Sequence, residues 1–214
     1  MNDLRKSIVG ILAGTQSSYK FNGTGFLVEG GMIFTCAHVV GKDKAVGQLV
    51  FFQFDGNEAV LTAKIEYFKD YLDIAVLRPN SLPDTAIPLQ LAESKTSRGH
   101  KFSVFGYPQK GEFRGLYGQG NMMGLVIDNK GREVLQFASS QVTYGYSGGP
   151  IVDETHKMVI GMVRGGLQDG LSLKDKLGDT AFAIPTEILK VVCPALKIQE
   201  ASASFQKHFL DRNN

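Results

Sequence analysis

Short runs of apolar and β-branched residues recur along the whole chain, and each run is bounded by Gly, Asn, Asp or Pro. Runs of this length with these boundaries are typical of β-strands connected by tight turns. In the first half of the chain they predict strands over Lys6–Ala13, Gly25–Glu29, Met32–Cys36, Val46–Phe54, Ala59–Phe68 and Ile74–Leu77. In the second half they predict strands over His100–Tyr107, Gly118–Ile127, Glu133–Ala138, Pro150–Val152, Met158–Val163 and Ala181–Ile184.

A polar segment containing several prolines separates the two sets of runs. It extends from Arg78 to Gly99 and contains Pro79, Pro83 and Pro88. Because proline cannot donate to a β-ladder and favours extended connections, we expect this segment to cross between two units rather than form a strand. Six strands on either side predict an all-β fold of two six-stranded antiparallel β-barrels. The barrels are expected over residues 1–80 and 100–196, with the connector over 81–99.

One short helix is expected near the C-terminus, over Thr186–Val192, because its apolar residues share one face and Pro194 follows it. The polar remainder of the chain, 197–214, fits neither barrel. It is interpreted as a frayed end, a second helix or the start of a linker to a further domain.

Composition narrows the class of protein. Hydrophobic residues make up 43% and charged residues 21% of the 214 residues, which is the balance of a folded globular protein. The formal net charge is +2 and the basic residues are scattered, so nucleic acid is not an expected partner. No apolar run is long enough to cross a bilayer. The run Ile8–Ala13 follows Arg5 and Lys6 as in a signal peptide, but it is short and no small-residue cleavage site follows, so we interpret it as the first strand.

The chain has two cysteines, Cys36 and Cys193. Two cysteines in a chain of this length do not form a disulfide framework, and the sequence leaves open whether they meet. Cys36 lies among apolar residues, where a small buried thiol is the expected role. These features favour a reduced, cytoplasmic environment. No metal site and no cofactor are expected.

The segment from Gly145 to Pro150 reads GYSGGP and has the residue types that amide hydrolysis requires. The hydroxyl of Ser147 is a candidate nucleophile on a turn that small neighbours permit. The amides of Gly145 and Ser147 are candidate donors to an oxyanion, since glycine at 145 frees the peptide to adopt the necessary conformation. Gly-rich turns that contain serine are also common in β-proteins, so this motif alone does not establish an active site.

Two further residues complete a candidate constellation. His38 follows the predicted strand Met32–Cys36 directly, where a general base at a cleft is expected, although a single histidine is more often structural. Asp73 opens the apolar strand Ile74–Leu77, and burying its carboxylate is costly unless a partner such as an imidazole N–H is present. The other three histidines, His100, His156 and His208, are interpreted as surface residues of polar loops or the tail.

The segments 35–40 (TCAHVV), 73–77 (DIAVL) and 145–150 (GYSGGP), in this order, resemble the trypsin/chymotrypsin-like serine protease family. The chain order His, Asp, Ser is the order of that family. The resemblance is closest to the HtrA-like (high-temperature-requirement) branch, in which a Gly-Ser/Thr-Gly-Phe strand precedes the histidine motif, as Gly23–Val28 does here. It covers about residues 7 to 192 and implies a chymotrypsin-like fold and protein or peptide substrates.

The resemblance also implies the roles of the site residues. His38 is implied as the general base, Asp73 as its orienting carboxylate and Ser147 as the nucleophile, with the amides of Gly145 and Ser147 as the oxyanion hole. Relatives activated by cleavage carry an Asp before the nucleophile, but Tyr146 stands there, so activity without cleavage before Ile8 is expected. No PDZ domain is expected after residue 192, so PDZ-dependent behaviour is not carried over.

The resemblance places the primary specificity pocket between the segment before the nucleophile and two later strands. Its predicted lining is Gln141, Val142, Thr143, Val163, Arg164, Gly165, Gly166 and Ala181. Enzymes of this fold that prefer Arg or Lys keep an Asp where Gln141 stands, and glutamyl endopeptidases keep a His where Val163 stands. A neutral, small-to-medium residue before the cut is therefore expected. Arg164 either supports the pocket from behind or lends it a positive charge that favours an acidic residue. Substrate backbone is expected to lie along 164–166 as an added strand.

Two alternatives to a free-standing serine endopeptidase remain at this stage. A catalytically silent pseudoprotease would use the same cleft to bind peptides. An effector part of a larger intracellular protein would account for the polar tail, which would then lead to an additional domain or regulatory partner.

Overall fold

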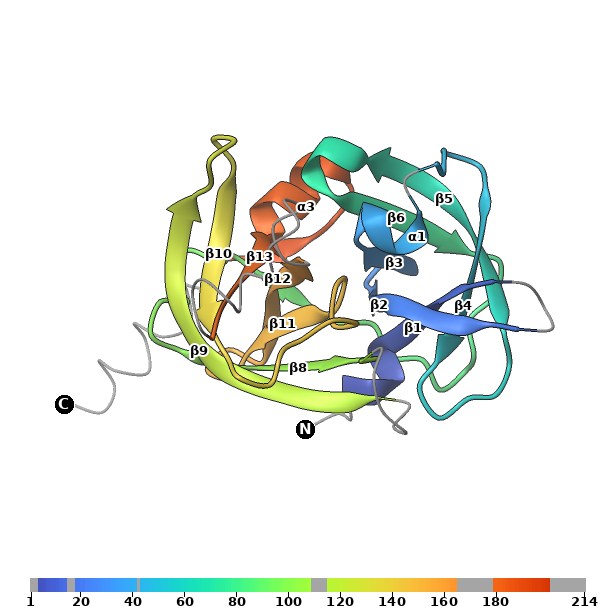
Figure 1. Ribbon diagram of the computed structural model, residues 1–214, viewed down its shortest axis with the longest axis horizontal. Helices are drawn as coiled ribbons and strands as arrows, with labels where there is room; N and C mark the ends of the chain where they lie inside the picture. The colour runs from blue at the N-terminus through green and yellow to red at the C-terminus, as the bar shows by residue number, and fades with distance from the viewer. Residues whose placement is uncertain (1–3, 15–17, 42, 109–114, 165–178, 201–214) are drawn as a thin grey trace.

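The computed structural model describes residues 4–14, 18–41, 43–108, 115–164 and 179–200. These residues form two closed β-barrels that lie side by side, as Figure 1 shows. The predicted all-β architecture of two six-stranded antiparallel barrels is therefore confirmed. Among the described residues, no helix is both long and apolar enough to cross a membrane.

The first barrel closes in the strand order β1-β2-β3-β6-β5-β4, with every pairing antiparallel. Its strands are β1 (Ile8–Ala13), β2 (Lys20–Val28), β3 (Met32–Thr35), β4 (Leu49–Phe54), β5 (Leu61–Lys69) and β6 (Ile74–Pro79). Burial alternates along β4, because one face of the strand lies in the barrel core. Val50, Phe52 and Phe54 are buried, while the residues between them are more exposed. A 3₁₀ turn, η1 (Leu4–Ser7), occupies the first residues of the predicted strand Lys6–Ala13.

The second barrel has the order β11-β8-β9-β10-β13-β12, and the pairing of β11 with β12 closes it. Its strands are β8 (Lys101–Gly106), β9 (Leu116–Ile127), β10 (Glu133–Ala138), β11 (Pro150–Asp153), β12 (Met158–Arg164) and β13 (Thr180–Pro185). The predicted helix is observed as α3 (Thr186–Val192), which buries Leu189 and Val192.

Two very short strands depart from the predictions for the connector and the tail. β7 (Leu91–Ala92) pairs in parallel with β12 and with β14 (Ile198–Gln199). The connector is thus not free of strand, and the first residues of the predicted tail belong to the second sheet. The prolines of the connector all precede β7, so its backbone keeps the donors that a ladder requires. Burial explains the pairing, since Leu91 is 2% exposed and Ala92 is fully buried.

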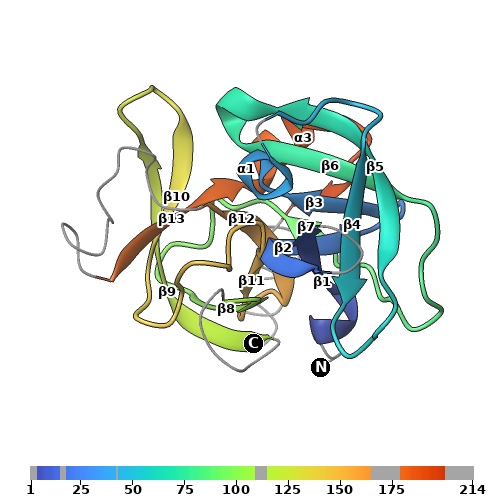
Figure 2. The same ribbon diagram turned by 45° about the vertical axis from the view of Figure 1, so that its right-hand side comes forward.

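A single turn of helix, α1 (Ala37–Val40), was not predicted. It follows β3 directly and ends at Gly41, whose φ of 108° is unfavourable for other residues. In Figures 1 and 2, α1 lies on the side of the first barrel that faces the second. The chain between β3 and β4 therefore turns at the junction of the two barrels.

The apolar core of the first barrel continues across the junction into the second barrel. A single cluster of buried residues contains Phe26 and Ile33 of the first barrel together with Met162 and Leu189 of the second unit. The cysteines also lie in this cluster and are both unpaired and buried, so they do not form a disulfide. Because the barrels pack through buried side chains, residues at their junction hold fixed relative positions.

Candidate active site

His38 lies on the helical turn α1, at the end of β3. Its neighbours Ala37 and Val39 are buried, whereas the His38 side chain is 30% exposed. The turn is closed by the Val39 amide, which donates to the Cys36 carbonyl, and by the Gly41 amide, which donates to the Ala37 carbonyl. The helical turn thus anchors its apolar residues in the core and presents the imidazole at the junction of the barrels.

Asp73 lies opposite, between the 3₁₀ turn η2 (Asp70–Leu72) and β6. Its backbone is left-handed, with φ 59° and ψ 42°, a conformation that Asp and Asn tolerate better than most residues. Its side chain is 10% exposed. The left-handed turn directs it away from the strand and toward α1.

Asp73 and His38 are joined by three contacts. Oδ1 of Asp73 accepts the backbone N–H of His38 at 3.0 Å, and Nδ1 of His38 lies 2.9 Å from Oδ1 and 2.8 Å from Oδ2. An ionised carboxylate only accepts hydrogen bonds, so Nδ1 carries the proton in this pair. In the neutral ring, Nε2 is then unprotonated and acts as an acceptor. The two side chains that the sequence singled out are therefore in hydrogen-bond contact.

Ser147 lies on the turn between β10 and β11, packed against the first barrel. Its carbonyl accepts the Thr24 amide at 2.9 Å, and Ser147 is 8% exposed. A Cβ atom on Gly148 would lie 2.0 Å from the Thr24 carbonyl oxygen and 3.1 Å from the Cys36 amide nitrogen, which places this turn directly beside the residues that precede His38. The fold therefore brings the serine-containing turn to the same junction as His38 and Asp73.

The predicted oxyanion donors have a suitable backbone setting. Gly145 has a φ of 98°, and a Cβ there would lie 2.0 Å from the Tyr107 carbonyl oxygen, so glycine is required. The Gly145 carbonyl accepts the hydroxyl of Thr24 at 2.7 Å, which fixes the peptide. Within the described ranges, the amides of Gly145 and Ser147 donate no hydrogen bond to the protein. They are available to an external acceptor.

Thr24 has a positioning role that sequence reasoning missed. Its hydroxyl accepts the Tyr107 amide at 3.1 Å while it donates to Gly145, and its own amide holds Ser147. One first-barrel residue therefore fixes both ends of the serine-containing turn. The signal was present in the segment 23–25, where a hydroxyl residue lies between two glycines, but its partners are more than eighty residues away in the chain.

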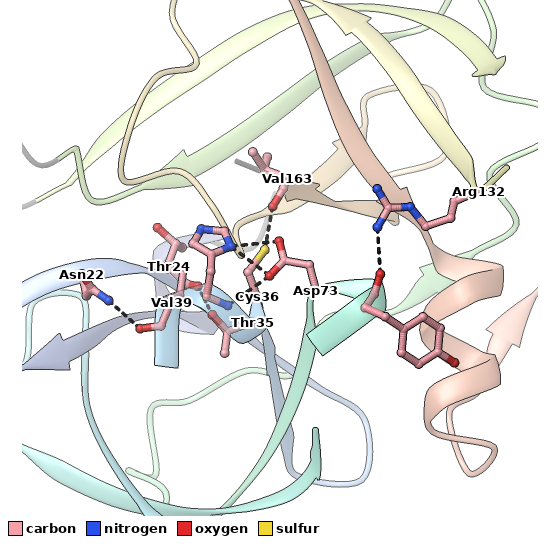
Figure 3. A network of polar contacts seen from close by, with 10 residues as sticks. Asn22, Thr24, Thr35, Cys36, Val39, Asp73, Arg132 and Val163 are labelled. Carbon is pink, nitrogen blue, oxygen red and sulfur yellow. Dashed lines mark hydrogen bonds and ion pairs between the residues drawn. The ribbon is translucent and has the colours of Figure 1, made fainter. Parts of the chain in front are cut away.

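Cys36 supports the site from within the core. Its thiol donates to the Val163 carbonyl at 3.3 Å, which joins the base of α1 to β12. Burial, followed by the negative charge of Asp73, raises the pKa of the Cys36 thiol well above its usual value, so the group is a neutral thiol. Figure 3 shows Cys36 close to Asp73, Thr35 and Val163. The expected role as a small buried thiol fits this position.

A second polar contact crosses between the barrels near Asp73. Arg132, at the turn between β9 and β10, donates from Nη1 to the carbonyl of Tyr71 at 2.8 Å, as Figure 3 shows. Asp128 holds this guanidinium, with 2.8 Å between Nε and Oδ2. The second barrel therefore braces the η2 turn two residues before Asp73. The sequence carried no signal for this contact.

The ion pairs of Asp128 give the fold a pH-dependent stability. Burial by itself raises the pKa of Asp128, but hydrogen bonds from the Arg132 side chain and from the amides of Arg132 and Lys130 outweigh it and hold the pKa well below its usual value. A depressed folded-state pKa means that the carboxylate stabilises the fold above its unfolded pKa of about 4 and that this contribution is lost as the pH falls. Asp128→Asn is therefore expected to lower Tm by about 2–5 °C at pH 7 and by less at pH 3.

Thermal unfolding of the variant and the wild type across this pH range checks the prediction. Asp84→Asn is the matched control, because Asp84 is exposed and should give the same Tm as the wild type at every pH. An equal loss of Tm for Asp128→Asn at pH 3 and pH 7 would contradict the ionic explanation.

The structure brings together some of the predicted specificity residues. Val142 and Val163 belong to one buried apolar cluster of the second barrel, and the partly buried Ala181 packs against it. Gln141 and Thr143 are exposed, and the Gln141 side chain accepts the Gln119 amide at 3.0 Å. Gly165 and Gly166 lie outside the described residues, as does the rest of the predicted substrate strand after Arg164.

Arg164 forms an ion pair that bears on the alternatives for its role. Its side chain is 13% exposed, and Nη1 lies 3.5 Å from Oδ2 of Asp128. Asp128 is the carboxylate that also binds Arg132. The charge of Arg164 is thus directed toward a carboxylate of the β9–β10 turn.

The two barrels carry a His–Asp pair and a glycine-rich serine turn at their junction. This arrangement is typical of a two-barrel peptidase. Comparison with known families is consistent with this class, because residues 23–162 match the model of the trypsin-like peptidase domain. The chain therefore belongs to the trypsin-like peptidase family, as its motifs predicted. No curated protein sequence matches it at a significant level.

Several solved structures share the fold. The active form of the Rv3671c protease from M. tuberculosis superimposes with a TM-score of 0.68 at 22% identity, covering 92% of this chain and 83% of that one. The inactive form of the Rv3671c protease gives 0.66 at 22% identity, with 90% of each chain covered. A serine endoprotease from Yersinia pestis gives 0.66 at 18% identity and covers 89% of this chain and 62% of that one.

Proposed function

We propose that this protein is a serine endopeptidase in which Ser147 is the nucleophile, His38 the general base and Asp73 the residue that orients the imidazole. The observation that carries the proposal is the contact of His38 Nδ1 with both carboxylate oxygens of Asp73, at 2.9 and 2.8 Å, at the junction where the Ser147 turn packs. This contact leaves Nε2 as the acceptor that a serine hydroxyl requires.

The proposed reaction follows from these positions. Nε2 of His38 takes the proton of the Ser147 hydroxyl while Oγ attacks the carbonyl carbon of the peptide bond. The amides of Gly145 and Ser147 bind the oxyanion that forms. The imidazolium then donates its proton to the amine as the C–N bond breaks, which leaves an acyl-enzyme. Water, deprotonated by His38, hydrolyses the ester and restores Ser147.

A fluorophosphonate probe tests the nucleophile directly. The folded chain is expected to gain one phosphonyl group, and peptide mapping is expected to place it on Ser147. Heat-denatured protein and Ser147→Ala are the controls, and both should remain unlabelled. A folded chain that takes up no label, or that is labelled elsewhere, would overturn the proposal and favour the peptide-binding pseudoprotease.

We further propose a preference for a neutral, small-to-medium residue before the scissile bond. Support comes from the buried apolar cluster of Val142 and Val163, against which Ala181 packs, and from the ion pair that directs Arg164 toward Asp128. Such pockets discriminate a single methylene by only about 1–3 kcal/mol, so aliphatic residues of neighbouring size should be cut at rates within about two hundredfold of each other.

A peptide library with one varied position, read by mass spectrometry of the products, measures this preference. Cleavage after Val, Ala or Leu is the expected outcome. Strong cleavage after Arg or Lys would contradict the neutral preference inferred from Gln141. Strong cleavage after Asp or Glu would show that Arg164 acts on the substrate.

A further inference from the structure

Three metal-ligating side chains converge at the end of the second barrel, on elements that play no part in the proposed reaction. Asp153 ends β11 and is fully buried, His100 immediately precedes β8, and His156 lies on the turn between β11 and β12. Nδ1 of His100 lies 2.8 Å from Oδ2 of Asp153, and Nδ1 of His156 lies 2.7 Å from the same oxygen. Both histidines lie outside the strands, as expected, but they are not free surface residues, because each contacts the buried carboxylate of Asp153.

The pairing of β11 with β8 explains the convergence. Asp153 is opposite Phe102, so the residue before β8 lies beside the β11–β12 turn. The side chains of His100 and His156 are 26% and 8% exposed, and their ring centroids are 5.3 Å apart. Sequence spacing gave no sign of this cluster, because fifty-three residues separate His100 from Asp153.

Backbone hydrogen bonds hold the three residues in place. The Thr155 amide donates to Oδ1 of Asp153 at 2.8 Å, and the Lys157 amide donates to the Asp153 carbonyl at 2.7 Å. On the other side, the His100 amide donates to the Ser97 carbonyl at 3.0 Å. The ligand atoms are therefore preorganised, which lowers the cost of binding an ion between them.

Asp153 supplies the negative charge that a bound cation requires. Its fully buried carboxylate accepts hydrogen bonds from Nδ1 of His100, Nδ1 of His156 and the Thr155 amide. The nearby ammonium of Lys157 forms an ion pair with Glu154, which directs that positive charge to another carboxylate.

We propose that His100, Asp153 and His156 bind a divalent transition-metal ion, with zinc as the best match. Two imidazole nitrogens and one carboxylate oxygen are a ligand set that zinc accepts, with water as the fourth ligand. The three ligand atoms lie within 4.8 Å of one another. At zinc–ligand distances of about 2.0–2.2 Å, a tetrahedral site requires donor atoms about 3.3 Å apart, so each Nδ1 needs to move only about half an ångström further from Oδ2 of Asp153.

Binding changes the hydrogen bonds but not the framework. Without an ion, the two Nδ1–H groups donate to Asp153. On metal binding these nitrogens coordinate the ion, and their protons pass to Nε2 or to solvent. The ion would then join the start of β8 to the β11–β12 turn. Since β11 begins three residues after Ser147, the metal would stabilise the strand that supports the serine-containing turn.

Zinc titration of the purified chain tests the proposal. We expect one zinc per chain by isothermal titration calorimetry and a rise in Tm of about 5–10 °C at zinc one hundredfold above Kd. Cobalt(II) should give the visible absorption of a tetrahedral site. In the variants His100→Asn and His156→Asn, the asparagine side chain keeps an N–H that donates to Asp153, but the imidazole ligand is lost. Each variant should therefore bind zinc at least about a hundredfold more weakly than the wild type. Its Tm without metal should equal that of the wild type.

The candidate active site requires its own control, because Cys36, His38 and Asp73 also place ligand atoms within 4.8 Å of one another. His38→Asn is expected to retain zinc binding with an unchanged Kd. The proposal is overturned if the wild type binds no zinc, if both His100→Asn and His156→Asn bind it as the wild type does, or if His38→Asn alone abolishes binding. None of these readouts depends on peptidase activity.

Discussion

Replacing Ser147 with alanine is expected to reduce the turnover of a cleavable peptide by up to about a millionfold without unfolding the protein. The variant lacks the oxygen that forms the acyl-enzyme, and only substrate binding and the oxyanion donors remain to accelerate hydrolysis. The backbone contacts of the turn do not involve the side chain, because the Thr24 amide donates to the carbonyl of residue 147. Tm should therefore remain close to that of the wild type.

The measurement is kcat for a peptide selected from the library, with Tm recorded on the same samples. Ser81→Ala is the matched control, since Ser81 is exposed, and it should keep full activity. Ser147→Ala with activity within tenfold of the wild type would show that another group is the nucleophile.

Asp73→Asn is expected to lower kcat by about ten-thousandfold. Oδ1 of Asp73 accepts both the amide and Nδ1 of His38, and Oδ2 faces Nδ1 at 2.8 Å. If the asparagine oxygen keeps the bond to the His38 amide, its NH₂ group takes the place of Oδ2 and faces Nδ1. The ring must then carry its proton on Nε2, where it cannot accept the proton of a serine hydroxyl.

The backbone of this variant should be unchanged, because asparagine tolerates the left-handed conformation at position 73 as aspartate does. Asp70→Asn is the matched control, because Asp70 is exposed and lies on the same turn, and it should leave kcat unaltered. Asp73→Asn with kcat near the wild-type value would contradict the orienting role of the carboxylate and leave His38 to be held by other groups.

Local patterns predicted most of the regular structure. β10 (Glu133–Ala138) and α3 (Thr186–Val192) have the bounds that apolar periodicity and flanking turn residues indicated. These elements were predictable because their period and their end signals lie within a few residues of one another. The two-residue strands β7 and β14 were not predictable, since two residues carry no period and their strand character comes from partners elsewhere in the chain.

The candidate site divides in the same way. The sequence by itself identified Ser147, His38 and Asp73 as the candidates for a nucleophile, a base and an orienting carboxylate, because their chemistry and flanking motifs are local. Only the tertiary structure decided which side chains are in contact. Nδ1 of His38 lies less than 3 Å from both carboxylate oxygens of Asp73. Asp128 forms ion pairs with Arg132 and Arg164, and His100 and His156 both contact Asp153. The reason is physical: barrel closure and strand register set the neighbours of a side chain, and these depend on packing between segments far apart in the chain.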